Sequence, residues 1–126
     1  MLHAARGCGT QVIWDLCHYG WPDDLDIFAP AFVTCFANFA GAFAQVVAEE
    51  SDDVPFFCPI NEISFLAWAG GDVAYINPFA RGRGFELKVQ LARAAIEGIE
   101  AIWQRLPQAR IVHVDPVINI IPNPAR

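Results

Sequence analysis

Short apolar runs alternate along this chain with longer segments in which apolar residues recur at helical spacing. The runs are too short for helices and rich in β-branched or aromatic residues, so they predict strands. They cover residues 11–16, 56–60 and 111–114. Apolar side chains at three- and four-residue spacing predict amphipathic helices over 30–50 and 85–106. Helices of this length cross over between parallel strands, so the order predicts a βαβαβ unit of the α/β class.

The predicted strands are nearly all apolar, as expected for a parallel sheet that is covered on both faces. Pro59 cannot donate to a sheet ladder, which indicates an edge, a bulge or the end of a strand. In the first predicted helix, one stripe is interpreted as a packing face. It consists of Phe32, Phe36, Phe39, Phe43, Val46 and Val47. Segment 68–84 is rich in glycine and aromatic residues and is predicted to be a long functional loop, without the spacing of a phosphate cradle.

The amino-acid composition indicates that this chain has more apolar surface than a domain of its size can easily bury. Hydrophobic residues make up 55% and charged residues 17% of the 126, with a mean hydropathy of +0.32, whereas a soluble domain has about 25% charged residues. We expect Asp, Glu, Arg or Gly-Pro breaks to interrupt every apolar stretch before the roughly 18 consecutive residues that a membrane-spanning helix needs. We therefore expect another copy of the chain, or the remainder of a larger domain, to cover the excess apolar surface. A membrane is not an expected partner.

Charge and cysteine placement narrow the possible partners and compartment. The net charge is −6 and the eight Lys and Arg form no stripe, so nucleic acid is not an expected partner. Cys8, Cys17, Cys35 and Cys58 form no C-x-x-C pair, which predicts buried free thiols in a reducing, cytoplasmic compartment and no metal site. Residues 1–6 resemble the last turn of a helix and do not have the pattern of a signal peptide. We therefore expect this chain to be a segment of a longer protein.

Polar residues follow each predicted strand, and parallel strands bring their carboxyl ends to one edge of a sheet. Asp15 and His18 follow the first strand, Asn61 and Glu62 the second, and Asp115 the third. Apolar neighbours would partly desolvate Glu62, which suits a carboxyl group to proton transfer near neutral pH. The alternative is an ordinary Asn-Glu pair that caps the following helix.

The same edge carries residue types that suit a sugar. We expect His18, Asn61 and Glu62 to converge, with aromatic rings around them that pack on the C–H face of a sugar ring. These rings belong to Tyr19, Trp21, Trp68 and Tyr75. Nucleophilic Ser or Cys catalysis is less supported, because the sequence has no Gly-x-Ser-x-Gly elbow.

Two motifs resemble those of a known enzyme clan. The run His18-Tyr19-Gly20-Trp21-Pro22 is similar to the H-W-D-x-P segment after the third barrel strand of family 1 glycoside hydrolases. Pro59-Ile60-Asn61-Glu62 resembles the Asn-Glu that ends the fourth strand in the retaining clan of that family. Tyr19, Gly20 and Ile63 differ from the usual Trp, Asp and Pro.

This resemblance implies a single partial (β/α)₈ barrel domain over residues 1–126, with the third to fifth β/α units covering about 1–118. It implies a β-glucosidase-like, retaining O-glycoside hydrolase without a cofactor and with a carbohydrate substrate. Glu62 would be the general acid/base, Asn61 would hold the 2-hydroxyl, and His18 would bind other hydroxyls. Tyr19, Trp21 and Trp68 would complete the substrate site.

A retaining enzyme also needs a nucleophilic carboxylate, which in this clan follows the seventh strand. We do not expect Asp15 or Asp115 to take that role, and we interpret Asp15 as a buried hydrogen-bonding residue. Two alternatives stay open. The chain is a truncated, non-catalytic fragment that self-associates and binds carbohydrate without turnover, or it is a small flavodoxin-like binding domain.

Overall fold

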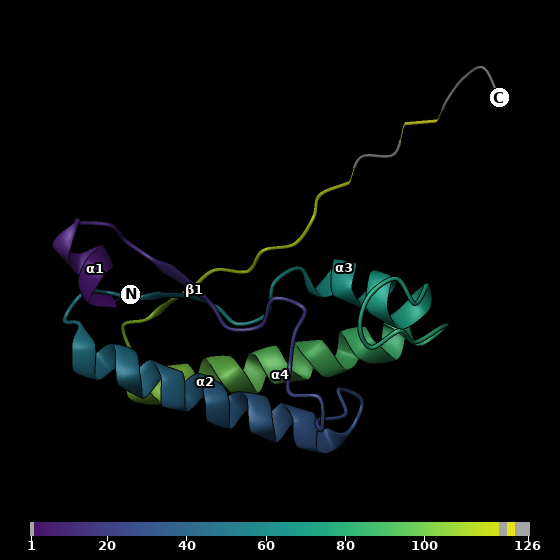
Figure 1. Cartoon of the computed structure of the whole chain (residues 1–126), viewed down its shortest axis with the longest axis horizontal. Helices are drawn as coiled ribbons and strands as arrows, with labels where there is room; N and C mark the ends of the chain where they lie inside the picture. Colours follow the sequence, from purple (N-terminus) through teal and green to yellow (C-terminus); the bar gives the residue numbers. More distant parts are fainter. Residues whose placement is uncertain (1, 119–120, 123–126) are drawn as a thin grey trace.

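The computed structural model describes residues 2–118, 121 and 122 and contains a small parallel sheet with long helices (Figure 1). In chain order the elements are α1 (Leu2–Gly7), β1 (Ile13–Asp15), α2 (Pro30–Glu50), β2 (Phe56–Cys58), α3 (Ile63–Leu66), the π-helix η1 (Ala67–Asp72), α4 (Gly84–Arg105) and β3 (Arg110–Ile111). The expected helical tail at the start corresponds to α1, although Met1 lies outside the described residues. The two long helices match their predicted ranges to within a residue or so.

The three strands form one parallel sheet in the order β1-β2-β3. Trp14 pairs with Phe57, and Phe57 pairs with Ile111. This confirms the predicted parallel βαβαβ arrangement and the α/β class. The strands are shorter than predicted, and β2 ends at Cys58 because Pro59 has no N–H to continue the ladder.

Helices α2 and α4 lie side by side along the same face of the sheet (Figure 1). Trp14, Phe57 and Ile111 stand on one rung and point into a core that both helices share. The helix residues of this core are Ala40, Ala44, Val47 and Ile102, with Leu106 just after α4. A second core cluster, nearer the carboxyl ends of the strands, packs buried residues of α2 and α4 against Cys17, Ile27 and Ile60.

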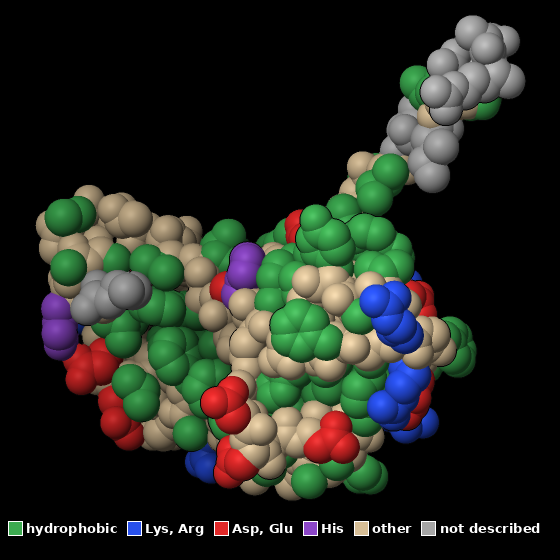
Figure 2. Space-filling model, turned by 45° about the vertical axis from the view of Figure 1, so that its right-hand side comes forward, with side chains coloured by type: hydrophobic (Ala, Val, Ile, Leu, Met, Phe, Trp, Pro, Cys, Tyr) green, Lys and Arg blue, Asp and Glu red, His purple; other side chains and the backbone are tan. Residues whose placement is uncertain are grey.

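The opposite face of the sheet is open at both outer strands in the described part of the chain, whereas Cys58 of the central strand, on the same face, is buried. Ile13 is 55% exposed, and Asp15 and Arg110 are exposed as well. Alternate residues of a strand point to opposite faces, so these side chains point away from the helices. The prediction that both faces are covered is therefore wrong. Figure 2 shows hydrophobic side chains spread over one face of the molecule, with only scattered charged side chains between them.

Helix α2 corrects two further expectations. Phe32, Phe36 and Val47 are buried as predicted, but Phe39 and Val46 are 48% and 47% exposed, so they do not belong to the packing face. The helix is also long and apolar enough to cross a membrane, with a mean hydropathy of 1.6 and 33% of the tested window buried. Our expectation of regular breaks is wrong here because the polar residues of α2 before Glu49 are uncharged. A core helix of a soluble protein meets the same criterion, and α2 packs on α4 and, through Phe43 and Phe57, on β2.

The predicted loop over 68–84 is partly helical instead. Helices α3 and η1 cover the chain up to Asp72, and a short connection follows in which Val73 bridges Arg81. Asp72 accepts a hydrogen bond from the Gly84 N–H over 2.7 Å. A Cβ on Gly71 would lie 2.8 Å from the Gly84 Cα, so glycine is needed for this close backbone approach.

Candidate functional site

The segment after β2 is tied by its backbone to the segments after both neighbouring strands. The Asn61 N–H donates to the Cys17 carbonyl over 3.0 Å, and the Glu62 N–H donates to the Val114 carbonyl over 2.9 Å. These bonds fix the Asn-Glu pair between its two neighbours at the carboxyl edge of the sheet. The expected convergence of the three strand ends is thus seen in the backbone.

A hydroxyl, an amide and a carboxylate meet at this edge. The Tyr19 hydroxyl donates to Glu62 Oε2 over 2.5 Å, and Asn61 Nδ2 donates to the Tyr19 oxygen over 3.0 Å. Asn61 is 9% exposed, and its hydrogen bond satisfies a polar group that would be costly to bury alone. Burial, followed by the hydrogen bond to Glu62, raises the pKa of Tyr19 to about 12. The phenol therefore stays neutral and keeps its donor.

Both residues at this contact have unusual backbone conformations. Tyr19 has a φ of 64°, and Glu62 has φ and ψ of 45° and 60°, in the left-handed region. For residues other than glycine this costs roughly 1–3 kcal/mol each, and such strain is concentrated at functional sites. The surrounding structure must compensate that cost, and the backbone bonds on either side of Glu62 contribute to doing so.

His18 lies next to Tyr19 and is held by an acid from β1. Its Nδ1 bonds to Asp15 Oδ2 over 2.7 Å, and the rings of His18 and Tyr19 have centroids 4.7 Å apart. Asp15 is a hydrogen-bonding residue as predicted. The expectation that it is buried is wrong, because it lies on the open face of the sheet and its side chain is 30% exposed.

Only some of the expected aromatic residues gather near Glu62. The Tyr19 ring packs on Phe65 at 5.5 Å, and Phe65 packs on Trp68 at 5.9 Å, which leaves the half-exposed Trp68 at the end of an aromatic row. Trp21 instead packs edge-on against Phe32 of α2, at 6.2 Å. Phe65 was missed by the sequence analysis, because a phenylalanine in an apolar run gives no signal of a site.

Asp115 has a structural task. Its two carboxylate oxygens accept hydrogen bonds from the Ser64 N–H and hydroxyl, over 3.1 and 2.7 Å, at the start of α3. Glu62 stands at the N-cap position of α3, yet its side chain makes no capping bond. The reading of Asn61-Glu62 as an ordinary helix cap therefore does not describe the Glu62 carboxylate, which is directed to Tyr19 instead.

The cysteines are free thiols, two of them buried and two exposed. Cys17 and Cys58 are buried, whereas Cys8 and Cys35 are exposed, so the prediction of burial is wrong for the latter pair. Burial, with a smaller contribution from Asp15, raises the pKa of Cys17 to about 11. Among the described residues, no group of three or more His, Cys, Asp or Glu is placed to hold a metal ion.

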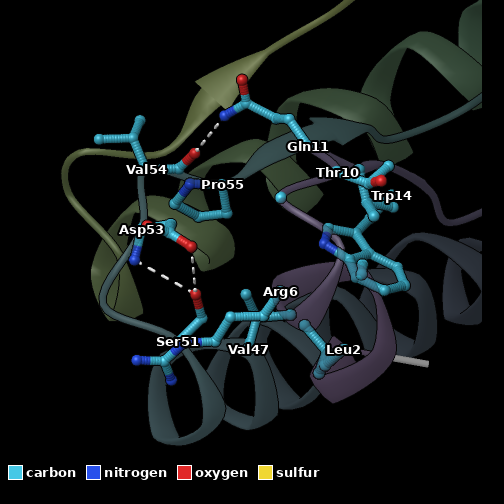
Figure 3. A pocket seen from close by; sticks show the side chains of 13 residues that line it. Leu2, Arg6, Thr10, Gln11, Trp14, Val47, Ser51, Asp53, Val54 and Pro55 are labelled. Atoms are coloured by element: carbon cyan, nitrogen blue, oxygen red, sulfur yellow. Dashed lines mark hydrogen bonds between the residues drawn. The ribbon is translucent and has the colours of Figure 1, made fainter.

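Two hollows of the described surface lie away from this edge. An open pocket of about 500 Å³ is found at the amino ends of β1 and β2, with Trp14 and Arg6 in its lining (Figure 3). Another, of about 520 Å³, lies between α2 and α4. Neither is lined by His18, Asn61 or Glu62.

No protein-family model matches this chain, and a search of curated proteins finds no match to it.

Proposed function

We propose that this chain forms part of the catalytic site of a retaining O-glycoside hydrolase, with Glu62 as the general acid/base. The observation that carries the proposal is the position of Glu62. Its carboxylate lies at the carboxyl edge of a parallel sheet, beside Asn61 and next to an imidazole-bearing loop, and is not used to cap a helix. Sites of α/β enzymes are built at this edge.

The architecture we propose is the third to fifth units of a (β/α)₈ barrel, and the parallel sheet is compatible with it. Sequential parallel strands with both crossover helices on one face are the arrangement of a barrel wall. The open face would then line the barrel interior. One half of a doubly wound sheet has the same arrangement, and the flavodoxin-like alternative rests on it. The Asn-Glu and His-containing motifs favour the barrel.

The residues present would divide the work in the following way. Glu62 would protonate the leaving oxygen and then activate water. Asn61 Nδ2 would hold a sugar hydroxyl. Because His18 uses Nδ1 on Asp15, its Nε2 would meet another hydroxyl, and the half-exposed Trp68 offers a face for the sugar ring. Trp21, which packs on Phe32 of α2, would hold the loop that carries His18 and Tyr19 against that helix.

The second carboxylate of a retaining pair lies about 5–5.5 Å from the first. Asp15 is bonded to His18 and Asp115 to Ser64, so neither is offered as the nucleophile. We assign that role to a further β/α unit of the barrel. No cofactor is required by this chemistry, and the proposed location is the cytoplasm, where four free thiols stay reduced.

The test is Glu62→Gln in the protein expressed from its complete reading frame, assayed on an aryl β-glucoside. General acid/base catalysis contributes about 10²–10⁴-fold, so we expect a loss of that size with sugar binding retained. Glu97→Gln, on the exposed surface of α4, is the matched control and should hydrolyse the substrate like the parent. Equal rates for the Glu62 variant and the parent would refute the assignment.

A second candidate is a non-catalytic chain that self-associates and binds carbohydrate without turnover. The open sheet face favours it, as do large exposed side chains such as Ile13, Phe85 and Val117, which are 55%, 82% and 99% exposed. Light scattering and the aryl β-glucoside assay on the 126-residue chain separate the candidates. A monomer that hydrolyses the substrate would exclude the second one.

A further inference from the structure

The Tyr19 hydroxyl occupies the space between the two groups that the proposed function assigns to the sugar. It accepts from Asn61 Nδ2 over 3.0 Å and donates to Glu62 Oε2 over 2.5 Å. A sugar hydroxyl has the same capacity, since it can accept from an amide and donate to a carboxylate. The Tyr19 oxygen therefore marks the position of a hydroxyl group with one defined donor and one defined acceptor.

We propose that this position is a hydroxyl subsite that Tyr19 fills in the absence of ligand, and that the hydroxyl of a neutral sugar displaces it. The inference rests on the proposed function for the class of ligand, and it deepens that function by naming what the sugar must replace. The resemblance assigned Tyr19 to substrate binding. Here the residue competes with the substrate.

The surroundings of Tyr19 allow such a displacement. Its backbone has a φ of 64°, in the costly left-handed region, so a move of the loop to an ordinary conformation would relieve strain. Gly20 follows, and a Cβ built on it would meet no atom within 4 Å, which leaves space for the loop to turn. The Tyr19 side chain is half-buried, with Phe65 and His18 as ring neighbours at 5.5 and 4.7 Å.

A fixed positioning role for Tyr19 makes the opposite prediction. If Tyr19 stayed in place and oriented Glu62 for the ligand, removing its hydroxyl would leave Glu62 less well held and weaken binding. If the sugar must displace the Tyr19 hydroxyl, its binding breaks two hydrogen bonds of the free protein. Removing the hydroxyl removes that cost, so binding should become tighter. Tyr19→Phe keeps the aromatic ring and distinguishes these roles by the sign of its effect.

The experiment is an equilibrium titration of the 126-residue chain with glucose, followed by tryptophan fluorescence. The net contribution of one hydrogen bond to a charged group corresponds to about a tenfold change or more in an equilibrium constant. In Tyr19→Phe the sugar no longer has to break the bond to Glu62, so the Kd of glucose should fall by about tenfold. Thr34→Val is the matched control, because it removes an exposed hydroxyl from α2, away from the site, and its Kd should equal that of the parent. With 2-deoxyglucose, which lacks the 2-hydroxyl that Asn61 would hold, the gain should disappear.

An unchanged or raised Kd of glucose in Tyr19→Phe would overturn the proposal, provided that its thermal midpoint shows a folded chain. An equal gain with 2-deoxyglucose, or no glucose binding by any variant, would overturn it as well. Failure of the hydrolase proposal looks different. Tighter glucose binding by Tyr19→Phe without aryl glucoside hydrolysis by the complete protein would retain the subsite and remove only the turnover.

Discussion

The contact between Tyr19 and Glu62 can be measured directly, because the chain has only two tyrosines. Replacing the exposed Tyr75 by Phe leaves Tyr19 as the sole phenol, whose ionisation is followed by absorbance at 295 nm. Burial and the hydrogen bond to Glu62 raise the pKa of Tyr19 to about 12 from an ordinary 10.0. At pH 11, a pKa of about 12 leaves about 9% of Tyr19 ionised, whereas the ordinary value would give about 91%.

Adding Glu62→Gln to this single-tyrosine variant separates the causes of the shift. Burial is the largest cause of the raised pKa and is unchanged in this variant. The carboxylate that accepts the hydrogen bond from the Tyr19 hydroxyl is removed. We therefore expect the midpoint to fall from about 12 toward 10 without reaching it. Absorbance should be read within seconds of a pH jump, before alkaline unfolding. The Tyr19→Phe/Tyr75→Phe double variant supplies the baseline.

Two results would refute the reasoning. A midpoint near the ordinary value in the parent background would mean that the hydroxyl is not held as described. An unchanged midpoint after Glu62→Gln would mean that Glu62 is not its acceptor. Stability should follow the same titration. Because the folded pKa is above the unfolded one, the contribution of Tyr19 is fully present below pH 10 and is lost as the pH rises toward 12.

Helix packing and thiol reactivity give further predictions. A Cβ on Gly98 would lie 2.7 Å from the Phe36 ring, so Gly98→Ala should lose about 1–3 kcal/mol to overpacking, more than the 0.5–1 kcal/mol of helix propensity it gains. In Gly41→Ala the nearest atom to the new Cβ is the Ala101 Cβ at 3.5 Å, so the gain in helix propensity should dominate. Equal stabilities of the two variants in urea unfolding would contradict the packing of α2 on α4. At pH 8, an aromatic disulfide reagent should modify the exposed Cys8 and Cys35 quickly and reach Cys17, whose pKa is raised to about 11, only on unfolding. Fast modification of all four thiols would contradict the described burial.

Local patterns of residues were enough to predict the order of the elements and the sheet edge that carries the polar residues. Helical spacing over 30–50 and short apolar runs around residues 13 and 57 are local signals, and helix α2 and strands β1 and β2 form there. Strand β2 ends just before Pro59, which is one of the three positions predicted for this proline. The strand ends met at one edge because parallel connection allows little else.

The contacts of the side chains at that edge depend on long-range packing and could not be predicted from local patterns. That Glu62 accepts from Tyr19, 43 residues away, and that Asp115 caps α3 in its place depend on backbone bonds between separate strand ends. The open sheet face and the exposure of Phe39 were also invisible in the pattern. Periodicity reports which residues share a face, whereas burial depends on whether another element covers that face, and this is a long-range property of packing.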